Sequence, residues 1–127
     1  MDKDLLNISK IESFFYELFY KHLSDNVFFT ALPESIKSSW KDMVVVDIDI
    51  TDNNVGKGIV NVFLYTKPFG DSRKNVSKLS LMEMKLNELI ERSLDEHYHI
   101  TRYKTYSDYD NSRNLYCSIV SLIIQII

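Results

Sequence analysis

Hydrophobic residues near the start of the chain recur in steps of three and four positions, which is the spacing of one helix face. This pattern predicts an amphipathic helix over residues 5–23, with Asn7 or Ser9 as its N-cap. Residues 25–41 show no sustained period, and we interpret them as a loop with one helical turn over residues 33–39. The apolar stripe of the helix consists of Leu5, Ile8, Ile11, Phe15, Leu18, Phe19 and Leu23.

Two stretches in the middle of the chain predict a β-hairpin. Residues 43–50, MVVVDIDI, alternate so that Val44 and Val46 share one face while Asp47 and Asp49 share the other. The turn-forming sequence TDNNVGKG follows, and residues 59–66, IVNVFLYT, have the composition of a returning strand. We expect one face of this hairpin to be buried.

The second half of the chain predicts one helix and two strands. Apolar residues at helical spacing predict a helix over residues 78–98, with Ser77 as its cap and His97 on its apolar stripe. Residues 100–109 have the composition of a strand, residues 110–112 of a turn, and residues 115–127 of a last strand. Because both faces of this last strand are apolar, we expect it to be central and covered on both sides.

The order α-β-β-α-β-β predicts an α+β fold, with two main helices packed on a mostly antiparallel four-stranded sheet. A chain of 127 residues has the size of one domain, so we place a single α+β domain over residues 1–127. Hydrophobic residues make up 45% of it, with only 3 Gly and 2 Pro, which argues against a disordered chain.

Charge and cysteine content disfavour several classes of function. The chain has 15 Lys and Arg against 18 Asp and Glu, and this net charge of -3 makes binding to nucleic acid unfavourable. Cys117 is the single cysteine, which excludes a disulfide within the chain and fits a reducing cytoplasm. The first residues lack the apolar run of a signal peptide, and the longest apolar stretch, residues 119–127, is too short to cross a bilayer. We therefore expect no membrane association.

Three carboxylates in and after the first predicted strand are the main candidates for chemistry. Asp47 and Asp49 share a strand face and Asp52 follows, so their oxygens suit a divalent cation. The sequence departs from a calcium-binding loop, which needs a glutamate where Gly58 stands, and from the phage resolvase motif, which has an asparagine in place of Ile50. A solvent-facing strand is the simpler interpretation, and a metal-dependent nuclease or resolvase is the alternative function.

The remaining polar motifs predict no catalytic, cofactor or metal site. Glu-Met-Lys at residues 83–85 lies within a predicted helix, and His22, His97 and His99 have no metal-binding spacing. Cys117 lies in an apolar strand, where a buried, inert thiol is the usual finding. The run over residues 97–109 mixes four tyrosines with Arg102 and Lys104, but Asp108 and Asp110 among them favour a protein surface over stacked bases.

More aromatic and apolar residues are present than one two-layer core needs, which predicts self-association. The surplus comprises Phe14, Tyr16, Tyr20, Phe28, Phe29, Val45, Phe63 and Tyr65. The order helix, hairpin, helix and two strands in a small acidic chain, over residues 11–23, 43–66, 79–98 and 103–127, resembles the phage tail-completion or tail-terminator family.

This resemblance implies a non-enzymatic subunit without cofactors that forms an oligomeric ring at the head-proximal end of a tail. It also implies binding to neighbouring tail and neck proteins, with assembly in the host cytoplasm and a final location in the virion. We expect the subunit contacts on the first helix and on the hairpin face that carries Val45. The predicted interface residues are Phe14, Tyr16, Tyr20, Val45, Phe63 and Tyr65.

Overall fold

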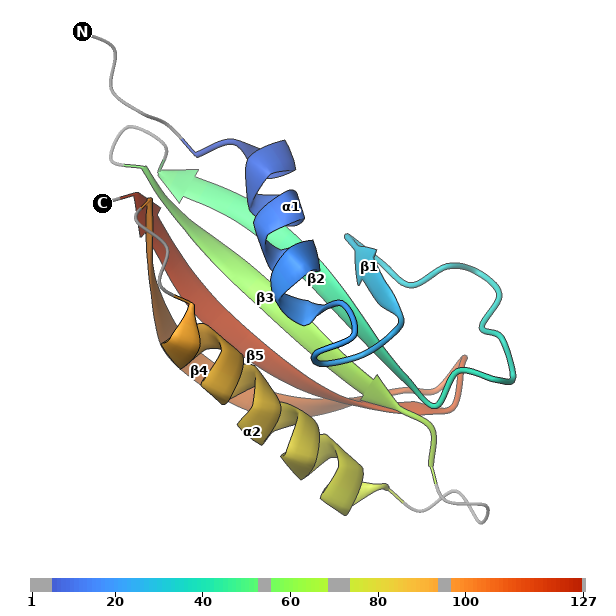
Figure 1. Ribbon diagram of the computed structural model, residues 1–127. Coiled ribbons are helices and arrows are strands. Elements are labelled where there is room, and N and C mark those ends of the chain that lie inside the picture. The colour runs from blue at the N-terminus through green and yellow to red at the C-terminus, as the bar shows by residue number, and fades with distance from the viewer. Residues whose placement is uncertain (1–5, 53–55, 69–73, 94–96, 127) are drawn as a thin grey trace, which may run out of the picture.

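The computed structural model describes residues 6–52, 56–68, 74–93 and 97–126, and in them two helices lie against one five-stranded sheet (Figure 1). Leu5, residues 53–55 and Ile127, which the sequence assigns to a helix, a turn and a strand, lie outside the described residues. The elements in chain order are α1 Ile8–Phe19, β1 Val27–Phe29, β2 Asp42–Asp52, β3 Lys57–Thr66, α2 Val76–Arg92, β4 Tyr98–Asp110 and β5 Leu115–Ile126.

The α+β class and the predicted hairpin are confirmed, but the prediction of a four-stranded sheet is wrong. The strand order is β1-β2-β3-β5-β4, and β1 lies parallel to β2 while all other pairs are antiparallel. Strand β1 has only three residues, Val-Phe-Phe, which is too short for an alternating pattern to be seen in the sequence. Strand β5 lies between β3 and β4, which confirms its central position.

Side-chain caps fix where both helices begin, and α2 is shorter than predicted. Asn7, one of the two candidates for the first cap, accepts a hydrogen bond from the backbone N–H of Lys10. Helix α2 is capped by Asn75 rather than Ser77. It ends at Arg92, because Ser93 adopts an extended conformation and its hydroxyl donates to the carbonyl of Ile90. The predicted place of His97 on this helix is therefore wrong.

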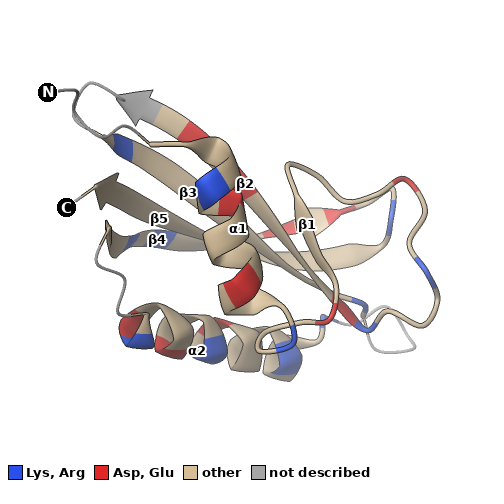
Figure 2. Cartoon of the chain, turned by 45° about the horizontal axis from the view of Figure 1, so that its top comes forward, with Lys and Arg blue, Asp and Glu red and all other residues tan. Residues whose placement is uncertain are grey.

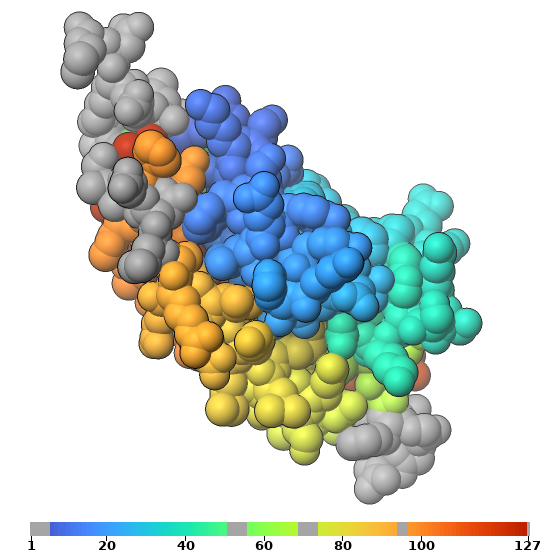
Figure 3. Space-filling view, in the orientation of Figure 1, coloured from blue at the N-terminus to red at the C-terminus, as the bar shows by residue number. Residues whose placement is uncertain are grey.

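Both helices cover the same face of the sheet and form the larger core with it (Figures 1 and 3). Each contributes residues spaced three or four apart, so that one stripe faces the strands. The strands contribute the alternate residues that point to this side, among them Val46, Val62 and Leu122, all at most 1% exposed. The helical members are Ile11, Phe15 and Phe19 from α1, and Leu79, Met82 and Leu86 from α2.

A second, smaller core lies on the opposite face of the sheet. Because β1 and β2 are parallel, the chain between them must return along the sheet, and the helices occupy one face. Residues 30–41 make this return as turns and bends without the predicted helical turn. Their apolar side chains Leu32, Ile36 and Trp40 pack with Phe28, Met43, Val45, Leu115, Phe63 and Tyr65. Much of the aromatic surplus therefore has a place inside the chain.

Candidate interaction surface

The face of the sheet opposite the helices, here called the helix-free face, is organised in rows that run across the strands. One row pairs Phe63 with Ile119 and then Tyr106, and another, four residues along, pairs Ile59 with Ile123. Between them lies a polar pair, in which the Ser121 hydroxyl donates to Asn61 Oδ1 at 2.5 Å. Two apolar rows thus flank one polar row on this face.

Three of these apolar side chains remain accessible because the return segment, residues 30–41, covers only one end of the face. Ile59, Phe63 and Ile123 are half-buried in the free chain, and Tyr106 at the edge is 45% exposed. Large apolar side chains gathered on a surface are typical of sites that bind another protein. The helix-free face is therefore the candidate interaction surface.

Of the three interface residues predicted on this face, Val45 and Tyr65 lie at its covered end and Phe63 lies at the border of the covered part. Val45 is only 2% exposed beneath the return segment, so it offers no surface in the free chain. Phe63 and Tyr65 are half-buried, and their rings stack with centres 6.2 Å apart. Their proximity is as expected for residues two apart on a strand, and their role in an interface stays a prediction.

The three interface residues predicted on α1 do not share one environment. Phe14 is half-buried and packs edge-on against Phe15 and Tyr98, with ring centres 5.1 and 5.5 Å away. Tyr16 is 40% exposed and stacks on the half-buried Tyr20 at 5.0 Å. Phe14 therefore completes the helix-side core, whereas Tyr16 is the residue of the three with most surface to offer.

Burial weakens the acidity of two groups on the helix-free face that face each other on β3 and β5. Desolvation raises the pKa of Cys117 to about 12, and the carboxylate of Asp108 adds to the shift. Desolvation also raises the pKa of Tyr65, whose hydroxyl is hydrogen-bonded to the Cys117 thiol. With 3% exposure and a protonated sulfur, Cys117 is a structural thiol, as the sequence predicts.

The predicted acidic residues lie along β2 but gather no further ligands. Asp47 and Asp49 point to the helix-free face opposite Asn61 and Ile59, while the side chain of Asp52 is outside the described residues. Within the described ranges, no three His, Cys, Asp or Glu side chains come close enough to hold a metal ion. The nuclease alternative therefore stays a prediction, without an observation in its favour.

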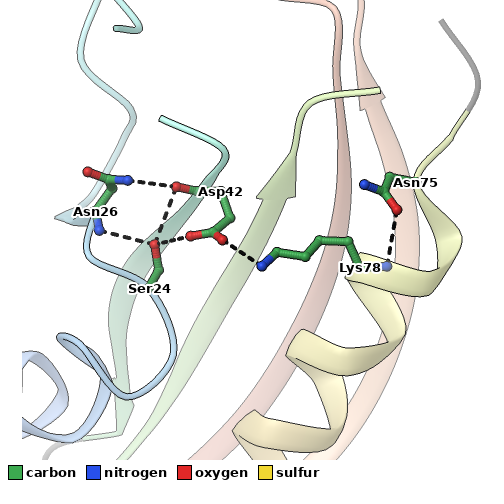
Figure 4. Close-up of polar contacts among 5 residues, drawn as sticks. All are labelled: Ser24, Asn26, Asp42, Asn75 and Lys78. Carbon is green, nitrogen blue, oxygen red and sulfur yellow. Dashed lines mark hydrogen bonds and ion pairs between the residues drawn. The ribbon is translucent and has the colours of Figure 1, made fainter. Parts of the chain in front are cut away.

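A polar cluster at the start of β2 connects three parts of the fold (Figure 4). The Asp42 carboxylate accepts a hydrogen bond from the Ser24 hydroxyl at 2.5 Å and pairs with Lys78 of α2 at 2.9 Å. The side-chain amide of Asn26 donates to the Asp42 carbonyl at 2.9 Å. An open pocket of about 310 Å³ adjoins Ser24, Asn26 and Asp42. Because these polar groups bond one another, the cluster serves to hold α2 and the α1–β1 loop to the sheet.

Charged residues lie along the outer surface of α2, with uncharged residues between them (Figure 2). Lys85 lies 3.8 Å from Glu88, and both are well exposed, which fits the predicted charged helix surface. Leu81 and Met84 are 62% and 60% exposed on this helix, and sequence reasoning missed them. Their exposure depends on the rotation of α2 against the sheet, which the stripe of Leu79, Met82 and Leu86 determines.

Comparison with models of known protein families found no match for this chain, and a search of curated proteins found no relative. In the described residues, no helix combines the length and apolar character needed to cross a membrane. Function must therefore be inferred from the surfaces of the fold.

Proposed function

We propose that this chain is a non-enzymatic structural subunit of a phage tail or neck, which assembles into a ring and binds neighbouring virion proteins through its helix-free face. One observation carries the proposal: two apolar rows, containing Ile59, Phe63 and Ile123, remain half-buried in the free chain. A protein surface of complementary shape would remove these side chains from water. The entropic cost of ordering would be small, since the strands that hold them are already ordered.

The element order supports the assignment to a tail or neck. The order helix, hairpin, helix and two strands gives the sequence its resemblance to tail-completion and tail-terminator proteins, and the described chain has these elements in this order with the short strand β1 added before the hairpin. In a ring, two different patches of each subunit meet, and closure follows from the rotation between neighbours. The helix-free face would supply one patch, and the exposed Tyr16 side of α1 lies on the other layer of the fold.

The experiment places a charge in the face and measures folding and assembly separately. Ile59→Asp and Ile123→Asp should each lower the melting temperature of the purified subunit by about 4–8 °C while leaving it folded, because each half-buried side chain loses part of its apolar contact and Ile59 pairs with Asp49 of β2. Incorporation into particles, measured by mass spectrometry of purified virions, should fall at least about tenfold, because the interface would bury an unpaired charge.

Leu81→Asp is the matched control, since Leu81 is 62% exposed on the opposite layer. This variant should assemble like the parent. Normal incorporation of both isoleucine variants would refute the proposed use of the helix-free face. Absence of the parent protein from purified particles, with tails of normal length in a strain that lacks it, would refute the structural role itself.

A further inference from the structure

Strand β4 forms one edge of the sheet, and within the described residues it pairs only with β5. It is 13 residues long and most of its side chains are exposed. The backbone groups that point away from β5 therefore form a row of donors and acceptors suited to another strand. The opposite edge, β1, has only three residues. Of the two edges, β4 is the one long enough to pair with another chain.

Two opposite charges on β4 are placed symmetrically about Tyr106. Lys104 and Asp108 face Ser121 and Cys117 of β5, so both lie on the helix-free side with Tyr106 between them. Among the described residues, neither forms an ion pair. The Lys104 ammonium lies 5.4 Å from the Tyr106 ring centre, and Asp108 Oδ1 accepts only the N–H of the next residue.

We propose that β4 pairs antiparallel with β4 of a second copy of this chain, with Tyr106 on the two-fold axis. In such a pair, each residue faces the one equally distant from residue 106 on the other side. Lys104 of each copy then faces Asp108 of the other, which gives two cross-strand ion pairs. Thr105 faces Ser107, and Tyr106 faces its own copy.

The charges favour this register and this partner over the alternatives. An axis at residue 104 or 108 would place like charges opposite each other, and an axis at residue 105 would leave Lys104 facing Tyr106. An axis at residue 107 would leave Asp108 facing Tyr106 and would bring Lys104 opposite Asp110, which already pairs with Arg113. The positive and the negative charge, Lys104 and Asp108, are both on β4, at equal distances from Tyr106. The strand that matches β4 is therefore β4 itself, running in the reverse direction.

The helix layer and the bulge in β4 are compatible with a closed dimer. Helix α2 packs mainly on β3 and β5, and its last turns adjoin Ile100 and Arg102 of β4 rather than Tyr106 at the axis. The register of β4 shifts between Arg102 and Lys104, and a bulge of this kind bends a strand away from regular pairing. Pairing is thereby limited to the stretch around residues 103–109. An isologous pair also uses the same edge twice, and so it does not propagate into a fibre.

Charge reversal tests the proposal on the purified chain. Sedimentation velocity over about 10 μM to 1 mM should show a monomer–dimer equilibrium for the parent. Lys104→Asp and Asp108→Lys should each raise the dissociation constant about tenfold or more, because both ion pairs become repulsive. The double variant restores opposite charges and should return to within about threefold of the parent. Lys10→Asp on α1 is the control for net charge and should leave dimerisation unchanged.

A disulfide tests the axis. Residues that face themselves across an antiparallel pair have Cα atoms about 4.5–5.5 Å apart, within disulfide range. Tyr106→Cys should therefore give a covalent dimer under mild oxidation, while Tyr103→Cys, which is more exposed but faces residue 109, should not. A parent that stays monomeric, single charge variants that dimerise like the parent, or equal cross-linking of both cysteine variants would each overturn the proposal. These outcomes do not depend on Ile59 or Ile123, so they are separate from the test of the proposed function.

Discussion

Removing the Asp42 carboxylate is the perturbation with the clearest expected effect on stability. This side chain is 16% exposed and holds both the Ser24 hydroxyl and the Lys78 ammonium. The Asp42→Ala variant loses a hydrogen bond to a charged group, worth about 1.5–3 kcal/mol. The Lys78 pair adds only about 0.5 kcal/mol, because Lys78 is 41% exposed and solvent screens it. We expect a total loss of about 2–3 kcal/mol in the free energy of unfolding.

The loss of stability is reduced in part because the Ser24 hydroxyl keeps a second acceptor. It also donates to the backbone carbonyl of residue 42 at 3.3 Å, and the substitution leaves this carbonyl in place. Asp42→Asn should therefore cost less, about 1 kcal/mol, since an uncharged acceptor remains for Ser24. Lys78→Met should cost about 0.5 kcal/mol alone. Combined with Asp42→Asn it should add almost nothing further, because the ion pair is already lost.

Urea denaturation followed by circular dichroism measures these differences. A loss of 2–3 kcal/mol lowers the transition midpoint by about 1–2 M at an m-value typical of small domains. Asp49→Ala is the control on the same strand, where an exposed carboxylate should change stability by less than about 0.5 kcal/mol. An Asp42→Ala midpoint within about 0.2 M of the parent would refute the view that this cluster holds α2 and the α1–β1 loop to the sheet.

Three further predictions concern single groups. The Cys117 thiol ionises near 9.0 when unfolded but near 12 when folded, so the unfolded chain binds fewer protons above pH 9 and stability falls as pH rises. In Cys117→Ala this part of the slope, which rises from about 0.7 kcal/mol per pH unit at pH 9 toward about 1.4 at pH 10.5, should vanish from urea titrations over that range. Thr66→Val should raise the free energy of unfolding by about 1 kcal/mol, since the buried Thr66 hydroxyl has no hydrogen-bond partner among the described residues; a lower midpoint would contradict this. Changing Asp47 and Asp49 together to Asn should leave stability nearly unchanged, and magnesium- or manganese-dependent DNA cleavage by the parent, lost in this variant, would disprove a purely structural role.

Periodicity was sufficient to predict the elements that are long and lie on one side of the core. The stripe of α1 and the alternation of β2 both continue over enough residues to show their period, and the structure confirms both elements. The end of α2 could not be predicted in this way. Apolar residues at helical spacing continue past Arg92. The helix nevertheless ends there, because the Ser93 hydroxyl donates a hydrogen bond to the carbonyl of Ile90, and a strand begins at Tyr98.

The second core was missed because it depends on the parallel pairing of β1, a contact between distant residues. Nothing local in residues 30–41 indicates that Leu32 and Trp40 lie on Met43 and Val45. Part of the apolar surplus counted in the sequence belongs to this internal packing, and the self-association inferred from it stays a prediction. The exposed residues of β4 and the half-buried Ile59 and Ile123 could be located only once the strand order was known.

The strand order also affects how the chain can fold during synthesis. Strand β3 lies at the centre of the sheet, but its second neighbour, β5, begins 49 positions after β3 ends, at Leu115. Until β5 is made, the nascent hairpin has an open edge at β3. Pairing across such a sequence distance is slow, and open edges attract other strands. Chains interrupted before Leu115 are therefore expected to aggregate or to be degraded, which makes translation of the last strand the step that commits the protein to its fold.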